Sequence, residues 1–389
     1  MLWMRGENMD AEFSHFDLRL VEPGFSSSLT DVIIELDHLR RKNLGGTARP
    51  EIFFQLKTIF HLLESIGSAR IEGNNTTITE YIESKITPSE PKGDNIQEIE
   101  NSEKGMHFID ENIEEGSFIS NAFILELHKI TVDRLNREGD NTPGYFRRGN
   151  VRITGSKHRP PDYIQVVDYM EELINFINKD DNHKYDLLKT AIAHHRFAWI
   201  YPFNNGNGRV VRLLTYALLI KQGFNVKNGR ILNPTAIFCL DRDRYYEMLE
   251  KADTGTDRGV LAWCQYVLSG LLDEINKIDN LTDHEFLAKK ILLPAVTYCF
   301  KRGNFSELEN DILKIAVAKI VFQSSDLKKA MPGKLPAERS RVIRKMKSMG
   351  LIRPVSENAR KYTISFTSNY LLRGVIDSLR NENFLSLQD

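Results

Sequence analysis

The fold is decided by the stretch Ile200-Tyr201-Pro202-Phe203-Asn204-Asn205-Gly206-Asn207-Gly208-Arg209-Val210-Val211-Arg212. Apolar segments with the length and composition of buried helices flank it, at residues 187–199 and 213–220. A loop rich in asparagine and glycine between two such helices is typical of a place where something docks. The stretch therefore predicts a ligand site held between two core helices.

The residue types in this loop indicate the kind of ligand. Gly206 and Gly208 let the backbone approach a ligand closely, just before the N-terminus of a helix. The amides and the helix dipole favour an anion there. Arg209 and Arg212 lie three residues apart, so both can project from the first helical turn toward the same anion. These features predict a phosphate-binding loop.

The stretch resembles the signature loop of Fic-domain proteins, which transfer the AMP part of ATP to a hydroxyl group of a target protein. That signature reads His-Pro-Phe-x-Asp/Glu-Gly-Asn-Gly-Arg-x-x-Arg. Tyr201 stands where the family has its general base, and Asn205 stands where it has the carboxylate that holds Mg²⁺. The positions that match in register are Pro202, Phe203, Gly206, Asn207, Gly208, Arg209 and Arg212.

The resemblance implies a mainly α fold with a Fic-type helical core and a β-hairpin flap. It implies ATP as the nucleotide, a protein as the substrate, and a weakened Mg²⁺ site at Asn205. Homodimers are common among such proteins. The phosphate-binding residues that the resemblance implies are Asn204, Gly206, Asn207, Gly208, Arg209 and Arg212.

The two departures fall on the residues that carry the chemistry. Histidine titrates near ~6.5 and tyrosine near ~10, so an unperturbed Tyr201 would be phenolate in only about one part in a thousand at pH 7. The amide of Asn205 brings no charge to Mg²⁺, which prefers carboxylate oxygen. We therefore expect weak or absent AMP transfer and weaker ATP binding.

Three functional hypotheses stay open on the sequence alone. The first is a Fic-type AMP-transferase scaffold that keeps its nucleotide pocket but is weak or inactive. The second is a DNA-binding regulator in which the degenerate core senses nucleotide or binds a partner. The third is a working enzyme of altered chemistry, in which Tyr201 is itself modified or another nucleotide is used.

An upstream pattern bears on regulation. Some Fic proteins carry an inhibitory helix with the pattern Ser/Thr-x-x-x-Glu-Gly/Asn, and Ser68, Glu72 and Gly73 match it. By this resemblance Glu72 would pair with Arg212 and occupy the guanidinium that a phosphate would otherwise take. The alternative is an ordinary helix C-terminus, with Gly73 just past the end and Glu72 in solvent.

Residues 144–153 break the helical period. Val151 and Ile153 alternate with polar residues, and Gly155 follows, which predicts a short β-hairpin. The resemblance implies that this hairpin is a flap whose edge, formed by Ile153, Thr154 and Gly155, binds the target segment by strand pairing. The alternative is an ordinary surface hairpin.

An aromatic pair follows the signature loop. The resemblance implies that Tyr245 and Tyr246 lie around the adenosine, with Asp253 at a later polar position. Successive side chains on a helix are ~100° apart, so at most one of the two rings can stack on a base. Core or interface packing of both tyrosines is the alternative. We expect His128 to be a structural or surface residue. Of His194 and His195, we expect one to lie in the core or to support the site and the other to be partly exposed.

The C-terminal part has its own pattern. Three predicted helices, the first opened by a capping box at Ser306 and Glu309, precede two strands, which predicts a winged helix-turn-helix domain. Basic residues outnumber acidic ones over residues 334–361, as on a surface that faces DNA phosphates. A protein-docking module or a solvated basic face would show the same excess of basic residues.

Length and composition limit the class of protein and its expected location. The chain has 389 residues and a net charge of −1, and its three cysteines are widely spaced. No signal peptide and no membrane span are apparent, so a cytoplasmic location without membrane contact is expected. We predict an N-terminal helical region over 1–110, a Fic core over 111–275, a connector over 276–304 and the winged helix over 305–389.

Overall fold

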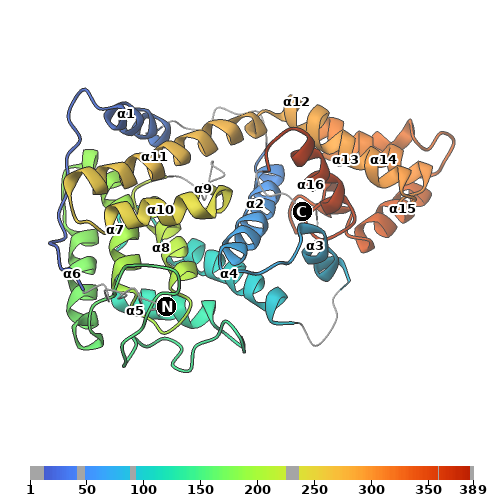
Figure 1. Cartoon of the computed structure of the whole chain (residues 1–389). Helices are drawn as coiled ribbons and strands as arrows, with labels where there is room; N and C mark the ends of the chain where they lie inside the picture. Colours follow the sequence, from blue (N-terminus) through green and yellow to red (C-terminus); the bar gives the residue numbers. More distant parts are fainter. Residues whose placement is uncertain (1–12, 42–48, 88–92, 225–235, 358, 386–389) are drawn as a thin grey trace, which may run out of the picture. The chain divides into compact units, whose positions relative to one another are not determined.

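The computed structural model describes residues 13–41, 49–87, 93–224, 236–357 and 359–385. The chain is mainly helical, as predicted, and divides into two compact units that we describe separately (Figure 1). The first unit contains residues 13–40, 104–224 and 241–270. The second contains residues 49–103, 236–240 and 271–385. Within the described residues, no helix has the length and apolar character needed to cross a bilayer.

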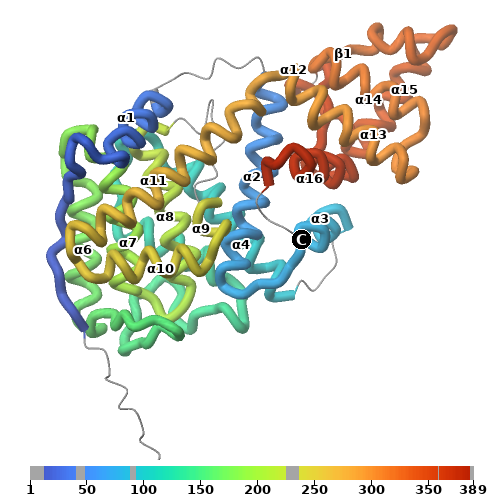
Figure 2. Tube along the Cα trace, turned by 45° about the horizontal axis from the view of Figure 1, so that its top comes forward, coloured from blue at the N-terminus to red at the C-terminus, as the bar shows by residue number. Residues whose placement is uncertain are grey.

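The first unit is built around two buried helices. Asp186–Ile200 forms α7 and Asn207–Lys221 forms α8, so the signature stretch joins them as predicted. Helix α7 packs between α6 and α8, and the three run side by side (Figure 1, Figure 2). The other elements that contribute to this unit are α1 (Ser28–Arg41), α4 (Asp94–Asn112), α5 (Asn121–Thr131), α6 (Val166–Asn178), α10 (Arg242–Ala252), α11 (Asp257–Asp279) and the 3₁₀ turns η1 (Tyr163–Gln165) and η2 (His183–Tyr185).

The N-terminal arm, residues 13–24, forms neither helix nor strand and is anchored by aromatic contacts. The Phe16 ring lies 5.1 Å from the Trp199 ring of α7, and the Phe16 carbonyl accepts a hydrogen bond of 3.0 Å from Arg196. The Arg196 guanidinium lies 4.2 Å from the Trp199 ring centroid. The arm thereby buries the end of α7 that leads into the signature loop.

The second unit has one continuous hydrophobic core. Its longest helix is α2 (Pro50–Ile71), which contributes buried residues along most of its length. The other elements are α3 (Ile78–Ile86), α9 (Ala236–Leu240), η3 (Asn280–Thr282), α12 (His284–Phe286), the π-helical turn η4 (Leu287–Leu292), α13 (Leu293–Lys301), α14 (Glu307–Lys319), η5 (Ser324–Lys328), α15 (Pro336–Ser348) and α16 (Leu371–Asn381).

A small antiparallel sheet closes the C-terminal part. Its strands are β1 (Phe322–Gln323), β2 (Ile352–Pro354) and β3 (Lys361–Ile364), in the order β1-β3-β2, with Phe322 opposite Tyr362 and Arg353 opposite Thr363. The capping box at Ser306 and Glu309 forms as predicted. The sequence pattern predicted β2 and β3 but missed β1, and assignment as a winged helix stays a prediction.

Within the predicted connector over 276–304, residues Leu293–Lys301 form helix α13. This helix packs closely against α16, because Gly374 has no side chain: a Cβ atom there would lie 2.6 Å from the Ala295 carbonyl oxygen. Of the predicted N-terminal region, residues 13–40 group with the first unit and 49–103 with the second. The predicted domain boundaries stay predictions.

The predicted hairpin has its turn but not its strands. The Ser156 N–H donates to the Ile153 carbonyl at 3.2 Å, and Gly155 takes a φ of 77°. In the described segment 141–161 no residue forms a strand ladder. A two-stranded ribbon is marginal by itself, and here side chains hold the segment instead.

Candidate functional site

The signature loop begins with a left-handed residue. Tyr201 caps the C-terminus of α7 with φ 51° and ψ 60°, and its N–H donates to the Phe197 carbonyl at 3.0 Å. Few residues other than glycine adopt this conformation, and histidine and asparagine tolerate it best. The backbone at the family's base position is therefore the feature that turns the chain out of the helix, and the Tyr201 side chain is half-buried there.

Asn207 closes the loop. Its side-chain oxygen accepts from the Phe203 N–H at 2.9 Å, and its amide donates to the Phe203 carbonyl at 2.8 Å. The side chain is buried and both of its groups are occupied by the loop itself. Asn207 therefore shapes the loop through its side chain, and phosphate binding by its backbone N–H at the start of α8 stays a prediction.

Gly206 and His128 pack against each other under the loop. A Cβ atom at Gly206 would lie 2.9 Å from Val132 Cγ1, and Gly206 itself has a φ of 77°. His128 stacks on Phe203 with ring centroids 3.8 Å apart. Its Nδ1 accepts from the Gly144 N–H at 3.0 Å, so its Nε2 donates to the Asn205 carbonyl at 3.2 Å. His128 is a structural residue, as predicted.

Asp140, which the sequence analysis missed, anchors the outer side of the loop. Its carboxylate accepts from the Thr142 N–H at 2.8 Å, from the Asn204 side chain at 3.3 Å and from the Asn205 N–H at 3.3 Å. Burial by itself would raise the pKa of Asp140, but these hydrogen bonds lower it. The predicted phosphate-binding side chain of Asn204 is therefore bound to a carboxylate.

Arg147, also missed, joins the loop to the predicted flap. Its guanidinium is buried and donates to the carbonyls of Tyr201 at 2.9 Å, Gly149 at 3.0 Å and Pro161 at 2.6 Å. Its backbone N–H donates to the Pro202 carbonyl at 2.9 Å. The structure thus brings the predicted flap residues Ile153, Thr154 and Gly155 into the segment that is fixed to the signature loop.

The two arginines of the signature lie on the first turns of α8 and are both 1% exposed. Arg209 donates to the Glu138 carbonyl at 2.9 Å, and the Glu138 carboxylate lies 3.9 Å away. Gly208, at the start of the same helix, is partly exposed. Both arginines lie at the start of α8, as predicted, but are almost closed to solvent, and phosphate binding by them stays a prediction.

The residues present do not fit a strong Mg²⁺ site. The Asn205 side-chain oxygen accepts from the Gly206 N–H at 2.7 Å, and its amide nitrogen lies 3.4 Å from Glu138 Oε2. Across the described ranges, no group of three or more His, Cys, Asp or Glu side chains is placed to hold a metal ion. Asn205 therefore offers one neutral oxygen that is already hydrogen-bonded.

The two histidines that precede Tyr201 on α7, His194 and His195, are hydrogen-bonded to residues outside the signature loop. His194 is buried between the Thr215 hydroxyl at 2.7 Å and the Tyr245 hydroxyl at 2.9 Å, and burial together with Arg212 holds its pKa well below the usual value. His195 contacts Asp253 at 2.9 Å. Both are buried, so the expected partial exposure of one of them is wrong, and neither replaces the base at Tyr201.

The aromatic pair separates into one core residue and one surface residue. Tyr245 is 2% exposed and bonded to His194, whereas Tyr246 is 43% exposed. Tyr245 is therefore the member of the pair that packs in the core, and adenosine binding by either tyrosine stays a prediction. Tyr246 keeps an accessible ring, with the Arg242 guanidinium 5.5 Å from its centroid.

The predicted inhibitory pattern lies at the end of α2. The Gly73 N–H donates to the Arg70 carbonyl and the Asn74 N–H to the Ala69 carbonyl, with Gly73 at φ 94°. This is a Schellman cap, so the helix-terminus reading holds for Gly73. Ser68 is buried and Glu72 is half-buried. Glu72 and Arg212 belong to different units, and their pairing stays a prediction.

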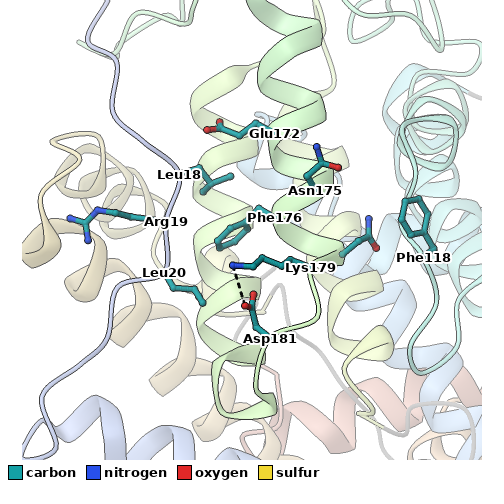
Figure 3. Close-up of a pocket in the computed structure, with 10 residues that line it drawn as sticks. Leu18, Arg19, Leu20, Phe118, Glu172, Asn175, Phe176, Lys179 and Asp181 are labelled. Atoms are coloured by element: carbon teal, nitrogen blue, oxygen red, sulfur yellow. Dashed lines mark ion pairs between the residues drawn. The ribbon is translucent and has the colours of Figure 1, made fainter.

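A separate cavity of about 670 Å³ lies in the first unit, between the N-terminal arm and the C-terminal end of α6 (Figure 3). Leu18, Leu20 and Phe176 give it an apolar lining, and an ion pair of 3.4 Å between Lys179 and Asp181 lies at its side. The signature loop does not contribute to it.

Comparison with known proteins points to the same segment of the chain. A family model described as Fic/DOC family matches residues 118–219, the segment from just before α5 to the end of α8 that contains the loop and its anchors. Residues 118–219 therefore form a Fic/DOC domain. Over 216 residues the Fic domain region is 29% identical to the protein adenylyltransferase Fic of Drosophila mojavensis, covering 54% of this chain and 39% of that relative.

Further relatives agree. The protein adenylyltransferase Fic of Drosophila melanogaster is 26% identical over 275 residues, or 64% of this chain and 51% of the relative, so the chain spans about half the length of these relatives or less. A Fic family protein from Desulfovibrio desulfuricans superimposes with a TM-score of 0.54 at 17% identity, covering 88% of this chain and 97% of its own. A Fic domain-containing signaling protein from Bacteroides thetaiotaomicron gives 0.52 at 17% identity, covering 66% and 98%. These structures confirm the Fic-type helical fold.

Replacing Arg147 tests the clamp between the flap and the loop. Arg147→Lys leaves buried carbonyls without donors, so we expect it to lower the free energy of unfolding by roughly 2–4 kcal/mol. The adjacent exposed residue supplies the matched control, Arg148→Lys, with an expected change within about 0.5 kcal/mol. Urea unfolding followed by tryptophan fluorescence measures both. Equal effects of the two variants would show that the clamp does not stabilise the fold.

A pH dependence follows from His128. Burial lowers its pKa to about 4, below the ~6.5 of an unfolded chain. As the pH falls, the unfolded chain therefore takes up a proton at a higher pH than the folded protein does. The contribution of neutral His128 to the free energy of unfolding is complete above about pH 6.5, and about 3 kcal/mol of it is lost as the pH falls to about 4. His128→Asn should make the free energy of unfolding less dependent on pH in this window.

The measurement is urea unfolding at several pH values between about 4 and 6.5. The slope should fall by up to about 1.4 kcal/mol per pH unit in His128→Asn. His183→Asn, an exposed histidine of the same unit, is the control and should keep the wild-type slope. An unchanged slope in His128→Asn would contradict the assignment.

Proposed function

We propose that the chain is a Fic-type AMP-transferase scaffold that binds ATP at the signature loop and transfers AMP to a protein hydroxyl weakly or not at all. This proposal rests on a contrast between the residues of the signature loop that match the family pattern and the one at the base position. Asn207, Gly206, Arg209 and Arg212 retain the anion-binding architecture, while Tyr201 replaces the base. The relatives named protein adenylyltransferase supply the expected reaction class.

The base position limits the chemistry. A tyrosine near pKa ~10 accepts a proton at pH 7 only if strong positive charge lowers that value. The nearest signature arginine, Arg209, is hydrogen-bonded to the Glu138 carbonyl. Loss of the carboxylate at Asn205 weakens Mg²⁺ binding in addition. Both changes reduce transfer more than they reduce nucleotide binding.

The proposal includes autoinhibition by Glu72. Burial of both Arg209 and Arg212 agrees with a state in which the phosphate site is covered. The cytoplasmic location and the homodimer remain part of this proposal. Cys239, Cys264 and Cys299 form no disulfide, which agrees with a reducing compartment.

Labelled ATP with Mg²⁺ tests the proposal directly. We expect label on protein only in the triple variant Glu72→Gly, Tyr201→His, Asn205→Asp, because this variant restores the base and the metal carboxylate and removes the inhibitor. Wild type and Glu72→Gly should remain unlabelled. Label on either of these would show that Tyr201 supports transfer.

A calorimetric titration with ATP separates binding from chemistry. Glu72→Gly should raise ATP affinity by about tenfold, the effect of removing one competing ion pair of about 1.4 kcal/mol. Glu83→Gly, at a second half-buried glutamate upstream of the Fic core, is the control. An affinity that does not change in Glu72→Gly would count against autoinhibition.

The C-terminal part favours a second candidate, DNA binding. Arg341, Arg344 and Lys347 are exposed and lie three residues apart on α15, so they form one basic stripe. Lys345 is instead paired with Glu309 at 2.7 Å, and Arg353 donates to the Glu51 carbonyl at 2.7 Å. The stripe is the part of residues 334–361 that could face phosphates.

DNA retention at low salt tests this candidate. Replacing the stripe with alanine should reduce the dependence of log affinity on log salt by about 0.9 for each phosphate that is no longer neutralised, or roughly 2–3 in total. The control triple variant removes other exposed lysines of the same unit, Lys289, Lys290 and Lys301. A wild-type chain that is not retained on DNA at low salt would exclude the second candidate.

A further inference from the structure

A short turn after α5, residues 135–140, lies against the outer side of the signature loop, and we call it the Gly139 turn. Its shape requires a glycine, because a Cβ atom at Gly139 would lie 2.1 Å from the Leu135 carbonyl oxygen. Acidic residues stand on either side of this glycine, Glu138 and Asp140. Asp140 anchors the loop through Asn204 and the backbone, so Glu138 is the carboxylate whose role is left to explain.

The Glu138 carboxylate lies among three donors. Its Oε2 is 3.4 Å from the Asn205 amide nitrogen and 3.9 Å from the Arg209 guanidinium, and its Oε1 accepts from Arg137 at 3.4 Å. The Glu138 carbonyl accepts from the same Arg209 guanidinium at 2.9 Å. The Arg209 side chain is 1% exposed and that of Glu138 is 25% exposed, so water screens their charges only in part.

This contact changes the charge that the signature loop offers to an anion. Arg209 and Arg212 contribute two positive charges, and both side chains are buried. One carboxylate within ion-pair distance of Arg209 leaves one net positive charge for the three groups together. Each further negative charge on a ligand therefore gains less from the loop than two arginines without this carboxylate would give it.

The residue at position 205 fits this arrangement. Asn205 donates its side-chain amide to Glu138, and its side-chain oxygen accepts from the Gly206 N–H at 2.7 Å. A carboxylate at this position, where the family signature has Asp or Glu, would place a second negative charge against Glu138. Asn205 and Glu138 are thus matched in charge, although 67 residues separate them in the sequence.

We propose that Glu138 is a specificity-determining residue that limits how much negative charge the signature loop accepts. Its carboxylate offsets the charge of Arg209, so the loop discriminates only weakly between nucleoside triphosphates and diphosphates. This role of Glu138 rests on the proposed function, because it concerns which nucleotide the same site takes. Glu138 lies outside the signature stretch and its side chain is partly exposed, so it can be changed without opening the core.

Isothermal titration calorimetry of the full chain with ATP and with ADP tests this role. The buffer contains EDTA, so the two nucleotides differ by one phosphate and its charge and not by a bound metal ion. Wild type should prefer ATP over ADP by less than about threefold. Glu138→Gln should raise ATP affinity by about tenfold and ADP affinity by about threefold, because the larger ligand charge gains more when the carboxylate is removed. Glutamine keeps the side-chain length, an oxygen acceptor for Asn205 and the carbonyl bonded to Arg209.

Glu126→Gln is the matched control, because it removes the same charge from a partly exposed glutamate of α5 in the same unit. Glu126 is paired with Lys129 at 3.4 Å, so its replacement should leave both affinities unchanged. The gain in Glu138→Gln should also shrink as salt is added. An unchanged ATP affinity in Glu138→Gln would overturn the proposal, as would an equal gain for ATP and ADP or the same gain in the control.

A second measurement needs no nucleotide. Asn205→Asp should lower the urea midpoint of the wild-type protein, because it sets two carboxylates against each other, and should lower it less in the Glu138→Gln background. An equal decrease in both backgrounds would show that Glu138 does not act on residue 205 and would overturn the proposal as well. If Glu138→Gln does not fold, the wild-type ratio decides, and a preference for ATP over ADP of about tenfold or more would overturn the proposal.

Failure of this role differs from failure of the proposed function. ATP binding by wild type that Glu138→Gln leaves unchanged would refute the role of Glu138 and leave the proposed nucleotide site intact. No ATP binding by wild type or by Glu138→Gln would refute the nucleotide site itself, and the selectivity with it.

Discussion

The carbonyl groups at the end of α7 need donors, and the architecture of the site depends on how that need is met. The last carbonyls of a helix have no partner inside the helix. Here the buried guanidinium of Arg147 supplies donors to the Tyr201 carbonyl and to the two ends of the segment that precedes α6. One side chain thereby terminates a core helix, orients the signature loop and holds the neighbouring segment.

Shape and chemistry are carried by different residues in this loop. Asn207, His128 and Asp140 hold it through contacts with the backbone of Phe203 and Asn205 and with the side chain of Asn204. Two hydrogen bonds of Tyr201, to the Phe197 carbonyl and from Arg147, use its backbone N–H and carbonyl. These two bonds can form with any side chain at the base position, so they are compatible with a tyrosine there.

The sequence predicted those elements whose pattern lies within a few consecutive residues. The apolar segments around the loop predicted α7 and α8, and the capping box at Ser306 predicted the start of α14. Arg147 and Asp140 escaped prediction because their partners lie 54 and 64 residues away. The strand β1 is two residues long, too short for a period, and the direction of the Tyr245 ring depends on packing that no local pattern encodes.

Burial of Arg209 and Arg212 also has a kinetic meaning. If nucleotide binds there as proposed, it would engage them only in the fraction of molecules in which they are exposed, and its apparent dissociation constant would exceed the intrinsic one by the inverse of that fraction. At high nucleotide concentration the observed association rate would then approach the rate of opening. The buried arginines would make the motion of the protein, rather than the encounter with nucleotide, the step that sets how quickly the proposed site fills.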